Sequence, residues 1–325
     1  MKPYAILCMM LLLALPLSAH ETQVEVPREW GTLHGTLMTP DSEADSDIVA
    51  LLIAGSGPTD RNCNSTMGLR TNAFAYISEV LVTEGIASYR YDKRGIGASA
   101  ANSISESSLR FDDYVDDAAA CVEHLVKMGY RRVLLIGHSE GSQIALAVAA
   151  HYESLPIAGI VSVSGTAHTM DHTLKIQLAH QLMAYDAGMM MVAMRIIDKI
   201  KAGERVPDDD IPQPLLSIFR ESVQGYLCSS MKEKFDPQKM ISGIDCPVMI
   251  VGGGMDLQVP LSEAEALHAV NRASRLVVLP QMSHTMKDTS SRDMMTQRQT
   301  VYADSSLPLS EGFVAVLREF VGGLK

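Results

Sequence analysis

The chain has 325 residues, of which 47% are hydrophobic and 20% charged, and its formal net charge is −11. This length and composition are typical of a globular protein with one large domain plus an insertion. The negative charge excludes the basic surface that binding to nucleic acid or docking on anionic lipid requires. No internal repeat or low-complexity tract is present.

The first 19 residues have the pattern of a secretory signal peptide. Lys2 supplies a positive start, residues 4–17 are almost wholly apolar, and Ser18 and Ala19 form a small-residue exit. An uncleaved membrane anchor is the alternative, but the apolar run is short for a span of about 20 residues. We therefore expect residues 1–19 to be removed and the mature chain to be secreted, into the periplasm of a Gram-negative bacterium, with no stable membrane span.

Two predicted strands come next, each followed by a glycine-rich loop. Residues 48–53 predict a buried strand, which runs into the sequence Gly-Ser-Gly-Pro at 55–58. Residues 87–91 predict a second strand, which runs into a polar turn over 92–99. A helix is expected from about Leu109 to Met128, and its acidic residues should favour the positive end of the helix dipole. These residues are Asp112, Asp113, Asp116 and Asp117.

The most informative motif is Gly-His-Ser-Glu-Gly at residues 137–141. A branched apolar strand over 133–136 precedes it, and a helix of small and apolar residues over 142–150 follows. A serine on a sharp strand-to-helix turn is the context that gives a G-x-S-x-G motif its meaning. Glycine neighbours let the strand and helix approach closely. The motif predicts that Ser139 is a catalytic nucleophile.

A serine nucleophile needs backbone donors for the oxyanion that forms during acyl transfer. One donor is the N–H of Glu140, directly after the nucleophile. The other should come from the loop after the first strand, from Ser56 or Gly57, since Pro58 has no N–H.

The stretch from about Ala167 to Met240 interrupts the alternation of strands and helices. It follows a strand over 159–163, and its helical pattern is broken by glycine and prolines, which predicts a cap. The cap contains five clustered methionines, which either line an acyl pocket or form the cap's own core. They are Met183, Met189, Met190, Met191 and Met194.

His168 and His172 are four residues apart in this stretch and have the spacing of a metal chelate on one helix face. No matching carboxylate pattern and no H-E-x-x-H signature accompanies them. We therefore expect no metal site in this chain.

Two further strands complete the candidate catalytic set. Asp256 comes directly after a strand over 247–254, and His284 follows a strand over 275–280, with a helix over 262–271 between them. The chain order Ser, Asp, His is that of α/β-hydrolases. Both residues should lie on the same sheet edge as Ser139, because open α/β sheets carry their sites at the carboxyl ends of strands. We expect His284 to be the general base and Asp256 to orient it.

Together these motifs resemble those of bacterial α/β-hydrolases of the serine carboxylesterase type. The resemblance rests on Gly137–Gly141, on the glycine-rich loops after the first two strands, on Gly-Gly-Gly-Met-Asp at 252–256 and on Ser-His-Thr-Met at 283–286. It extends from about Pro27 to the C-terminus. It implies a mostly parallel central sheet with helices on both faces and a helical cap. It also implies ester hydrolysis through an acyl-serine, with no metal or organic cofactor. Lipase relatives carry His-Gly-Gly in the oxyanion loop, and this chain does not.

The expected organisation is a signal peptide at 1–19, a hydrolase core at 20–166 and 241–325, and a helical cap at 167–240. The expected activity is hydrolysis of carboxylic esters with small to medium acyl groups. An exported peptidase, an aminopeptidase or a thioesterase of the same fold is the alternative, and a non-catalytic binding protein on this scaffold is a remote one. The sequence leaves open the physiological substrate, the acyl chain length, the alcohol group and the oligomeric state.

Four cysteines remain in the expected mature chain, and export permits disulfides. We expect Cys121, in a predicted helix, and Cys246, at the start of a predicted strand, to be free thiols. Cys63 and Cys228 lie in predicted loops near the candidate site, so a disulfide between them is possible.

Overall fold

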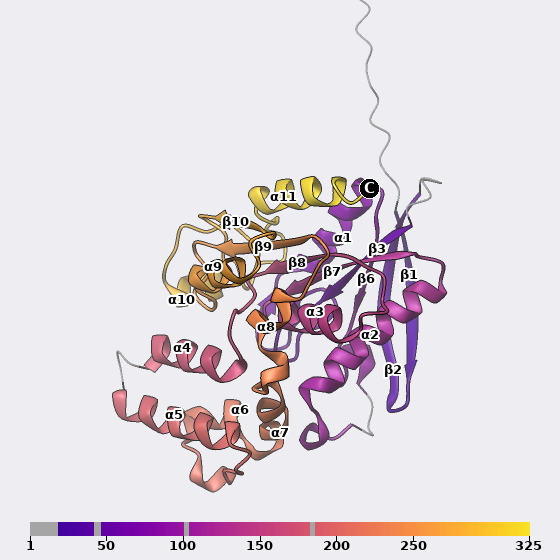
Figure 1. Cartoon of the computed structure of the whole chain (residues 1–325). Coiled ribbons are helices and arrows are strands. Elements are labelled where there is room, and N and C mark those ends of the chain that lie inside the picture. The colour runs from indigo at the N-terminus through magenta and orange to yellow at the C-terminus, as the bar shows by residue number, and fades with distance from the viewer. Residues whose placement is uncertain (1–18, 42–46, 101–103, 183–185) are drawn as a thin grey trace, which may run out of the picture.

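The computed structural model describes residues 19–41, 47–100, 104–182 and 186–325, and its centre is an eight-stranded sheet (Figure 1). The strand order is β1-β2-β6-β3-β7-β8-β9-β10. The six strands from β6 to β10 in this order are parallel to one another. At one edge, β2 pairs antiparallel with β6, and β1 pairs antiparallel with β2. The strands of the sheet are β1 (Ala19–Arg28), β2 (Gly31–Pro40), β3 (Ile48–Ile53), β6 (Ala87–Tyr91), β7 (Arg132–His138), β8 (Ile157–Val163), β9 (Val248–Gly253) and β10 (Arg275–Leu279). A separate hairpin pairs β4 (Asn64–Ser65) with β5 (Leu69–Arg70).

The central strands are apolar on both faces because helices cover both faces. Along β3, Val49 and Leu51 face one hydrophobic cluster, whereas Ala50 and Leu52 face the other. Strands buried on both faces read as continuous hydrophobic runs, which is why the parallel strands are visible in the sequence.

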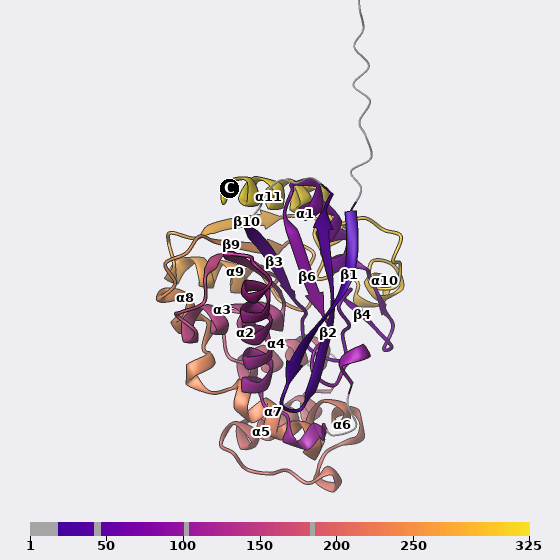
Figure 2. The same ribbon diagram turned by 90° about the vertical axis from the view of Figure 1, so that its right-hand side faces the viewer.

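Helices α2, α3, α8 and α9 pack against one face of the sheet, and α1 and α11 pack against the other (Figure 2). These helices are α1 (Ala73–Thr83), α2 (Phe111–Lys127), α3 (Glu140–His151), α8 (Pro237–Ser242), α9 (Leu261–Val270) and α11 (Glu311–Gly322). The short α10 (Met294–Gln299) lies in the long segment between β10 and α11.

Among the described residues, four α-helices between β8 and α8 form a separate helical layer, at the end of the molecule opposite α11 (Figure 1). They are α4 (Met170–Leu182), α5 (Ala187–Lys201), α6 (Gln213–Phe219) and α7 (Glu221–Ser230). The layer has its own hydrophobic cluster, centred on buried residues such as Ile197 and Phe219. Among the described residues, no helix is both long and apolar enough to cross a membrane.

The predicted fold class is confirmed, and the strands predicted from apolar runs agree with the structure within two residues at most ends. The sequence analysis missed the β1–β2 hairpin, α1, α10 and α11. It was also incomplete for Asp117, which it treated as a helix-dipole acid. Asp117 is buried and paired with two arginines. The expected signal peptide lies outside the described residues, except for Ala19, which begins β1.

Candidate active site

Ser139 occupies a sharp turn between β7 and α3, with φ 55° and ψ −122°. Its N–H donates to the Val163 carbonyl at 2.9 Å, which ties the turn to the end of β8. A Cβ on Gly137 would overlap the Gly141 carbonyl, and a Cβ on Gly141 would overlap the Ile53 carbonyl. Only glycine at both positions lets β7, α3 and β3 come this close.

Asp256 and His284 form a buried pair at the same edge of the sheet. The His284 Nδ1 lies 2.9 Å from the Asp256 Oδ2, and their side chains are 7% and 0% exposed. The other Asp256 oxygen accepts hydrogen bonds from the amides of Gln258 at 2.8 Å and Val259 at 2.9 Å. Burial opposes ionisation of Asp256, but His284 and these two amides outweigh burial and hold the pKa of the carboxyl below its usual value. The pair therefore leaves the His284 Nε2 as the ring nitrogen without a carboxylate partner.

Ser139 and His284 line one cavity of about 90 Å³. Residues from several loops contribute to its wall, including Ser56 and Tyr302. Among the described residues, its lining contains no aspartate and no glutamate, and none of it comes from residues 167–240. The cavity is therefore small, it carries no acidic lining side chain among the described residues, and it is built from the loops at the carboxyl ends of the strands.

Three of the residues that line this cavity have left-handed backbone conformations although they are not glycine. They are Ser139, Cys63 at φ 63° and Met286 at φ 62°. Such conformations cost of order 1–3 kcal/mol each and concentrate at functional sites. Cys63 and Met286 lie outside the serine motif, so their strained backbone beside the same cavity is a further observation that points to this site.

The predicted oxyanion loop lies directly against Ser139, the candidate nucleophile. A Cβ built on Gly55 would lie 3.0 Å from the Ser139 Cβ, and Ser56 lines the cavity. Gly57 has φ 76° and is not among the described lining residues. Glu140, whose N–H is the other expected donor, is the first residue of α3.

Lys93 supports this loop, a role that sequence analysis did not anticipate. Its Nζ donates to the carbonyl oxygens of Gly55 and, at 3.1 Å, of Gly57. Burial lowers the pKa of Lys93, and the Glu140 carboxylate opposes that shift. The preceding residue, Asp92, also contacts the loop that follows β3, because its carboxylate accepts a hydrogen bond at 2.8 Å from the Arg61 side chain. The sequence did contain a signal for this role, because Lys93 is a charged residue that follows directly after a predicted strand, at the edge of the sheet that carries Ser139.

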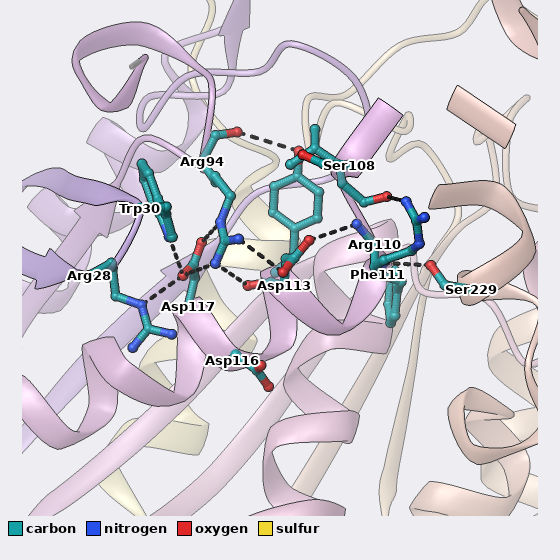
Figure 3. Close-up of polar contacts among 12 residues, drawn as sticks. Arg28, Trp30, Arg94, Ser108, Arg110, Phe111, Asp113, Asp116, Asp117 and Ser229 are labelled. Carbon is teal, nitrogen blue, oxygen red and sulfur yellow. Dashed lines mark hydrogen bonds and ion pairs between the residues drawn. The ribbon is translucent and has the colours of Figure 1, made fainter. Parts of the chain in front are cut away.

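The turn that carries Lys93 is anchored by a charge network on α2 (Figure 3). Arg94 donates to the Asp117 carboxylate at 2.7 and 2.8 Å and lies 2.9 Å from Asp113. Arg28 and Trp30 also donate to Asp117, at 2.9 and 3.2 Å. The network connects three elements, namely the β1–β2 hairpin, helix α2 and the loop after β6. It therefore holds Lys93, which lies in that loop, in position against the predicted oxyanion loop.

Tyr226 links the helical layer to the turn that carries Ser139. The Tyr226 hydroxyl of α7 donates to the Glu140 carboxylate, which is buried. Sequence analysis assigned Glu140 a backbone role only, and the side-chain partner lies 86 residues away.

His138 holds the segment of the candidate base. Its Nε2 lies 2.7 Å from the His284 carbonyl oxygen, and the two ring centroids are 4.8 Å apart. Burial, together with the charge of His284, lowers the pKa of His138 to about 3, so this ring is neutral and donates to the carbonyl.

The open alternatives for the cysteines and methionines are resolved by burial and contacts. All four described cysteines are free, so Cys63 and Cys228 form no bridge. Met190 is buried in the hydrophobic cluster of the helical layer, whereas Met191 is 62% exposed. Met183 lies outside the described residues. For Met190, the interpretation as the layer's own core is therefore the correct one.

A family model described as "Serine aminopeptidase, S33" matches residues 66–288. This match covers more than half of the chain, including Ser139, Asp256 and His284. The chain belongs to this α/β-hydrolase family. The matched range begins after the Gly-Ser-Gly-Pro loop, which therefore lies outside the match.

Several known proteins are similar to this family member. Esterase EstD of Thermotoga maritima is 24% identical over 235 residues, which are 72% of this chain but only 52% of EstD, so the chain spans about half of that relative. Human serine hydrolase BPHL is 23% identical over 84% of this chain and 90% of its own length. Among solved structures, Est1E from Butyrivibrio proteoclasticus with bound ferulic acid has a TM-score of 0.62 at 16% identity, covering 93% of this chain and 98% of Est1E. The esterase Pf2001 of Pyrococcus furiosus has a TM-score of 0.57 at 17% identity, covering 94% and 90%. These structural likenesses establish the fold.

Proposed function

We propose that the chain is a serine hydrolase that cleaves carboxylic esters through an acyl-serine intermediate. The observation that carries the proposal is that Ser139, on its strained turn, and His284, which is paired with the buried Asp256, line one cavity. The family membership and the similarity to proteins named as esterases support it.

In this mechanism the Ser139 Oγ attacks the ester carbonyl while the His284 Nε2 takes its proton. Asp256 holds the Nδ1–H and so selects the tautomer with a free Nε2. The tetrahedral oxyanion receives N–H bonds from Glu140 and from Ser56 or Gly57. The imidazolium then protonates the leaving alcohol, and water, activated by His284, releases the acid from Ser139.

The favoured substrate carries a short, uncharged acyl group. A cavity of about 90 Å³ is well below the roughly 300–1,000 Å³ of pockets for drug-sized ligands. The described lining contains apolar and neutral polar side chains together with His138 and His284, and no carboxylate that would hold a substrate amine. Esters of two- to four-carbon acids are therefore the expected substrates.

An aminopeptidase is the second candidate, because the matching family model carries that description. Such an enzyme holds the substrate's free amine, and an acidic side chain is the group suited to do so. Glu140 is the acidic side chain next to the nucleophile, but its carboxylate accepts a hydrogen bond from Tyr226 and is buried. This arrangement favours the ester over the aminoacyl substrate.

We further propose that the chain is exported, that residues 1–19 are a cleaved signal peptide, and that residues 167–240 form a cap on the hydrolase core. The apolar run over 4–17 with its small-residue exit supports export, and the separate hydrophobic cluster of α4–α7 supports the cap. Fractionation of the native host with N-terminal sequencing of the mature protein tests the first point, and a mature chain that begins at Met1 would contradict it.

The decisive experiment combines a covalent probe with a substrate panel. A fluorophosphonate should label the wild type and the exposed-serine control Ser242→Ala, but not Ser139→Ala. Hydrolysis of short-chain esters by Ser139→Ala should fall by about three orders of magnitude or more. The panel compares esters of graded acyl length, thioesters and aminoacyl anilides. Labelling of Ser139→Ala would overturn the nucleophile, and faster cleavage of anilides than of esters would favour the aminopeptidase.

A further inference from the structure

Three potential metal-binding side chains, two at or just before the start of α4 and one from α9, lie close together, and none of them lines the cavity of the candidate active site. His168 and His172 come from the segment after β8 and the first turn of α4, and Glu263 comes from the first turn of α9. One nitrogen of each imidazole and one oxygen of the carboxylate all lie within 4.8 Å of one another. The two histidines are close in the chain, but Glu263 is about 90 residues further on, so only the fold assembles the set.

We propose that His168, His172 and Glu263 bind a divalent transition-metal ion of the Zn²⁺ type. Two imidazoles and a carboxylate are a ligand set that such ions take, and catalytic zinc sites commonly use three protein ligands with a fourth position left to water. The site is separate from Ser139, so the inference goes beyond the proposed hydrolysis and does not depend on it.

The carboxylate of this site is already held in place. Glu263 is buried, and its Oε2 accepts a hydrogen bond from the Ala167 amide at 2.8 Å. A backbone donor of this kind orients a ligating carboxylate, as outer-shell partners do in metal sites. The oxygen Oε1 is then the one available to a cation.

The imidazoles are placed to complete the coordination. The His168 Nδ1 lies 3.0 Å from both Glu263 oxygens, so a cation can replace the proton that this nitrogen shares with the carboxylate. The His172 ring lies over the His168 ring, with centroids 4.0 Å apart and an angle of 32° between the planes. His172 is exposed, so its ring can rotate to bring its nitrogen within the metal–nitrogen distance of about 2.0–2.1 Å.

A bound ion would join the helical layer to the hydrolase core. Its ligands belong to the segment that leads into α4 and to α9, and α4 also contacts the Asp256 loop, where the Gln177 amide donates to the Gln258 carbonyl at 3.3 Å. The ion would therefore stabilise the packing of α4 against the hydrolase core. Because a ligand that binds only the folded state raises its stability, Zn²⁺ should raise the melting temperature.

The test uses the mature chain without a polyhistidine tag, stripped with a chelator and exchanged into metal-free buffer. Calorimetric titration should show one Zn²⁺ per chain at micromolar concentration, and Co²⁺ should give visible d–d absorption. His172→Gln, an exposed position where the fold should tolerate the change, should weaken Zn²⁺ binding by about 100-fold or more and abolish the Zn²⁺-dependent rise in melting temperature. His151→Gln, at an exposed histidine on α3, is the matched control and should bind as the wild type does.

Three results would overturn the site. They are the absence of stoichiometric binding to the wild type, unchanged affinity in His172→Gln, and equal loss in His172→Gln and His151→Gln. Glu263→Gln adds a second arm, because the amide can still accept from Ala167 while the anionic ligand is lost. Its circular dichroism and metal-free melting temperature would establish that the fold survives. With the fold intact, unchanged Zn²⁺ affinity in Glu263→Gln would also contradict the proposal.

Discussion

The carboxyl edge of the sheet and the helical layer are built on different principles. At the edge, Ser139, Asp256 and His284 are each fixed by backbone amides, strained dihedral angles or a buried partner, and the cavity wall comes from loops spread over the whole chain. The layer packs around its own cluster. Its described links to the edge include Tyr226 to Glu140 and Gln177 to Gln258. On the proposed function, the edge carries the chemistry, whereas the layer has its own hydrophobic cluster. Substitutions in the edge should therefore alter activity, and substitutions in the layer should alter stability.

The largest effect is expected at the edge, from loss of the base. His284→Ala should lower kcat/KM by about three orders of magnitude or more, because base and nucleophile act as a unit. Asp256→Asn should lower it by a similar factor, since an amide stabilises the wrong tautomer of the imidazole. Steady-state kinetics on a short-chain ester measures both, with His151→Gln as the control. Turnover of His284→Ala within tenfold of the wild type would refute the assignment.

The helical layer should respond in stability rather than in selectivity. Met190 is 4% exposed within the layer's cluster, so Met190→Ala should lower the free energy of unfolding by about 2–5 kcal/mol. The matched change Met191→Ala, at a side chain that is 62% exposed, should alter it by less than about 0.5 kcal/mol. Denaturant unfolding measures both. The ranking of acyl chain lengths should stay the same in both variants, and a changed ranking would mean that the layer shapes the substrate site.

Lys93→Met should have a smaller effect on catalysis, of about tenfold. Lys93 holds the carbonyls of Gly55 and Gly57, so its loss should loosen the oxyanion loop without removing a donor. The oxyanion develops only in the transition state, and the loss should therefore appear in kcat more than in KM. Lys175→Met, at a partly exposed lysine of α4, is the control. A rise in KM with unchanged kcat would show that Lys93 serves substrate binding instead.

The last expected effect is on the pH dependence of stability. The folded-state pKa of His138 is about 3, below its reference value of about 6.5, so the unfolded chain binds a proton that the folded chain does not. Between these two values stability should therefore rise with pH, by up to about 1.4 kcal/mol per pH unit from this residue. His138→Gln should reduce the slope of unfolding free energy between pH 5 and 6.5 in urea titrations, and His151→Gln should not. Equal slopes in all three proteins would exclude His138 as the source.

The parallel strands and the candidate triad were predictable because both depend on short-range patterns. Strands β3, β7 and β9 are buried on both faces and form apolar runs, and Ser139 and Asp256 follow β7 and β9. His284 follows β10, which is also an apolar run but is only partly buried. The β1–β2 hairpin was missed because neither strand contains a continuous apolar run. β1 is largely exposed, and β2, although partly buried, has threonine, glycine and histidine among its apolar residues. Helix α10 was missed because it is short and largely exposed.

By itself, the sequence determined which residues follow strands and which turn requires glycine, because strand burial and close backbone approach act over a few residues. Only the tertiary structure decided the partners of side chains far apart in the chain. It placed Tyr226 on Glu140, Lys93 under the oxyanion loop and Glu263 beside His168. These contacts depend on which helices and loops meet at one edge of the sheet, and no local pattern in the chain encodes that arrangement.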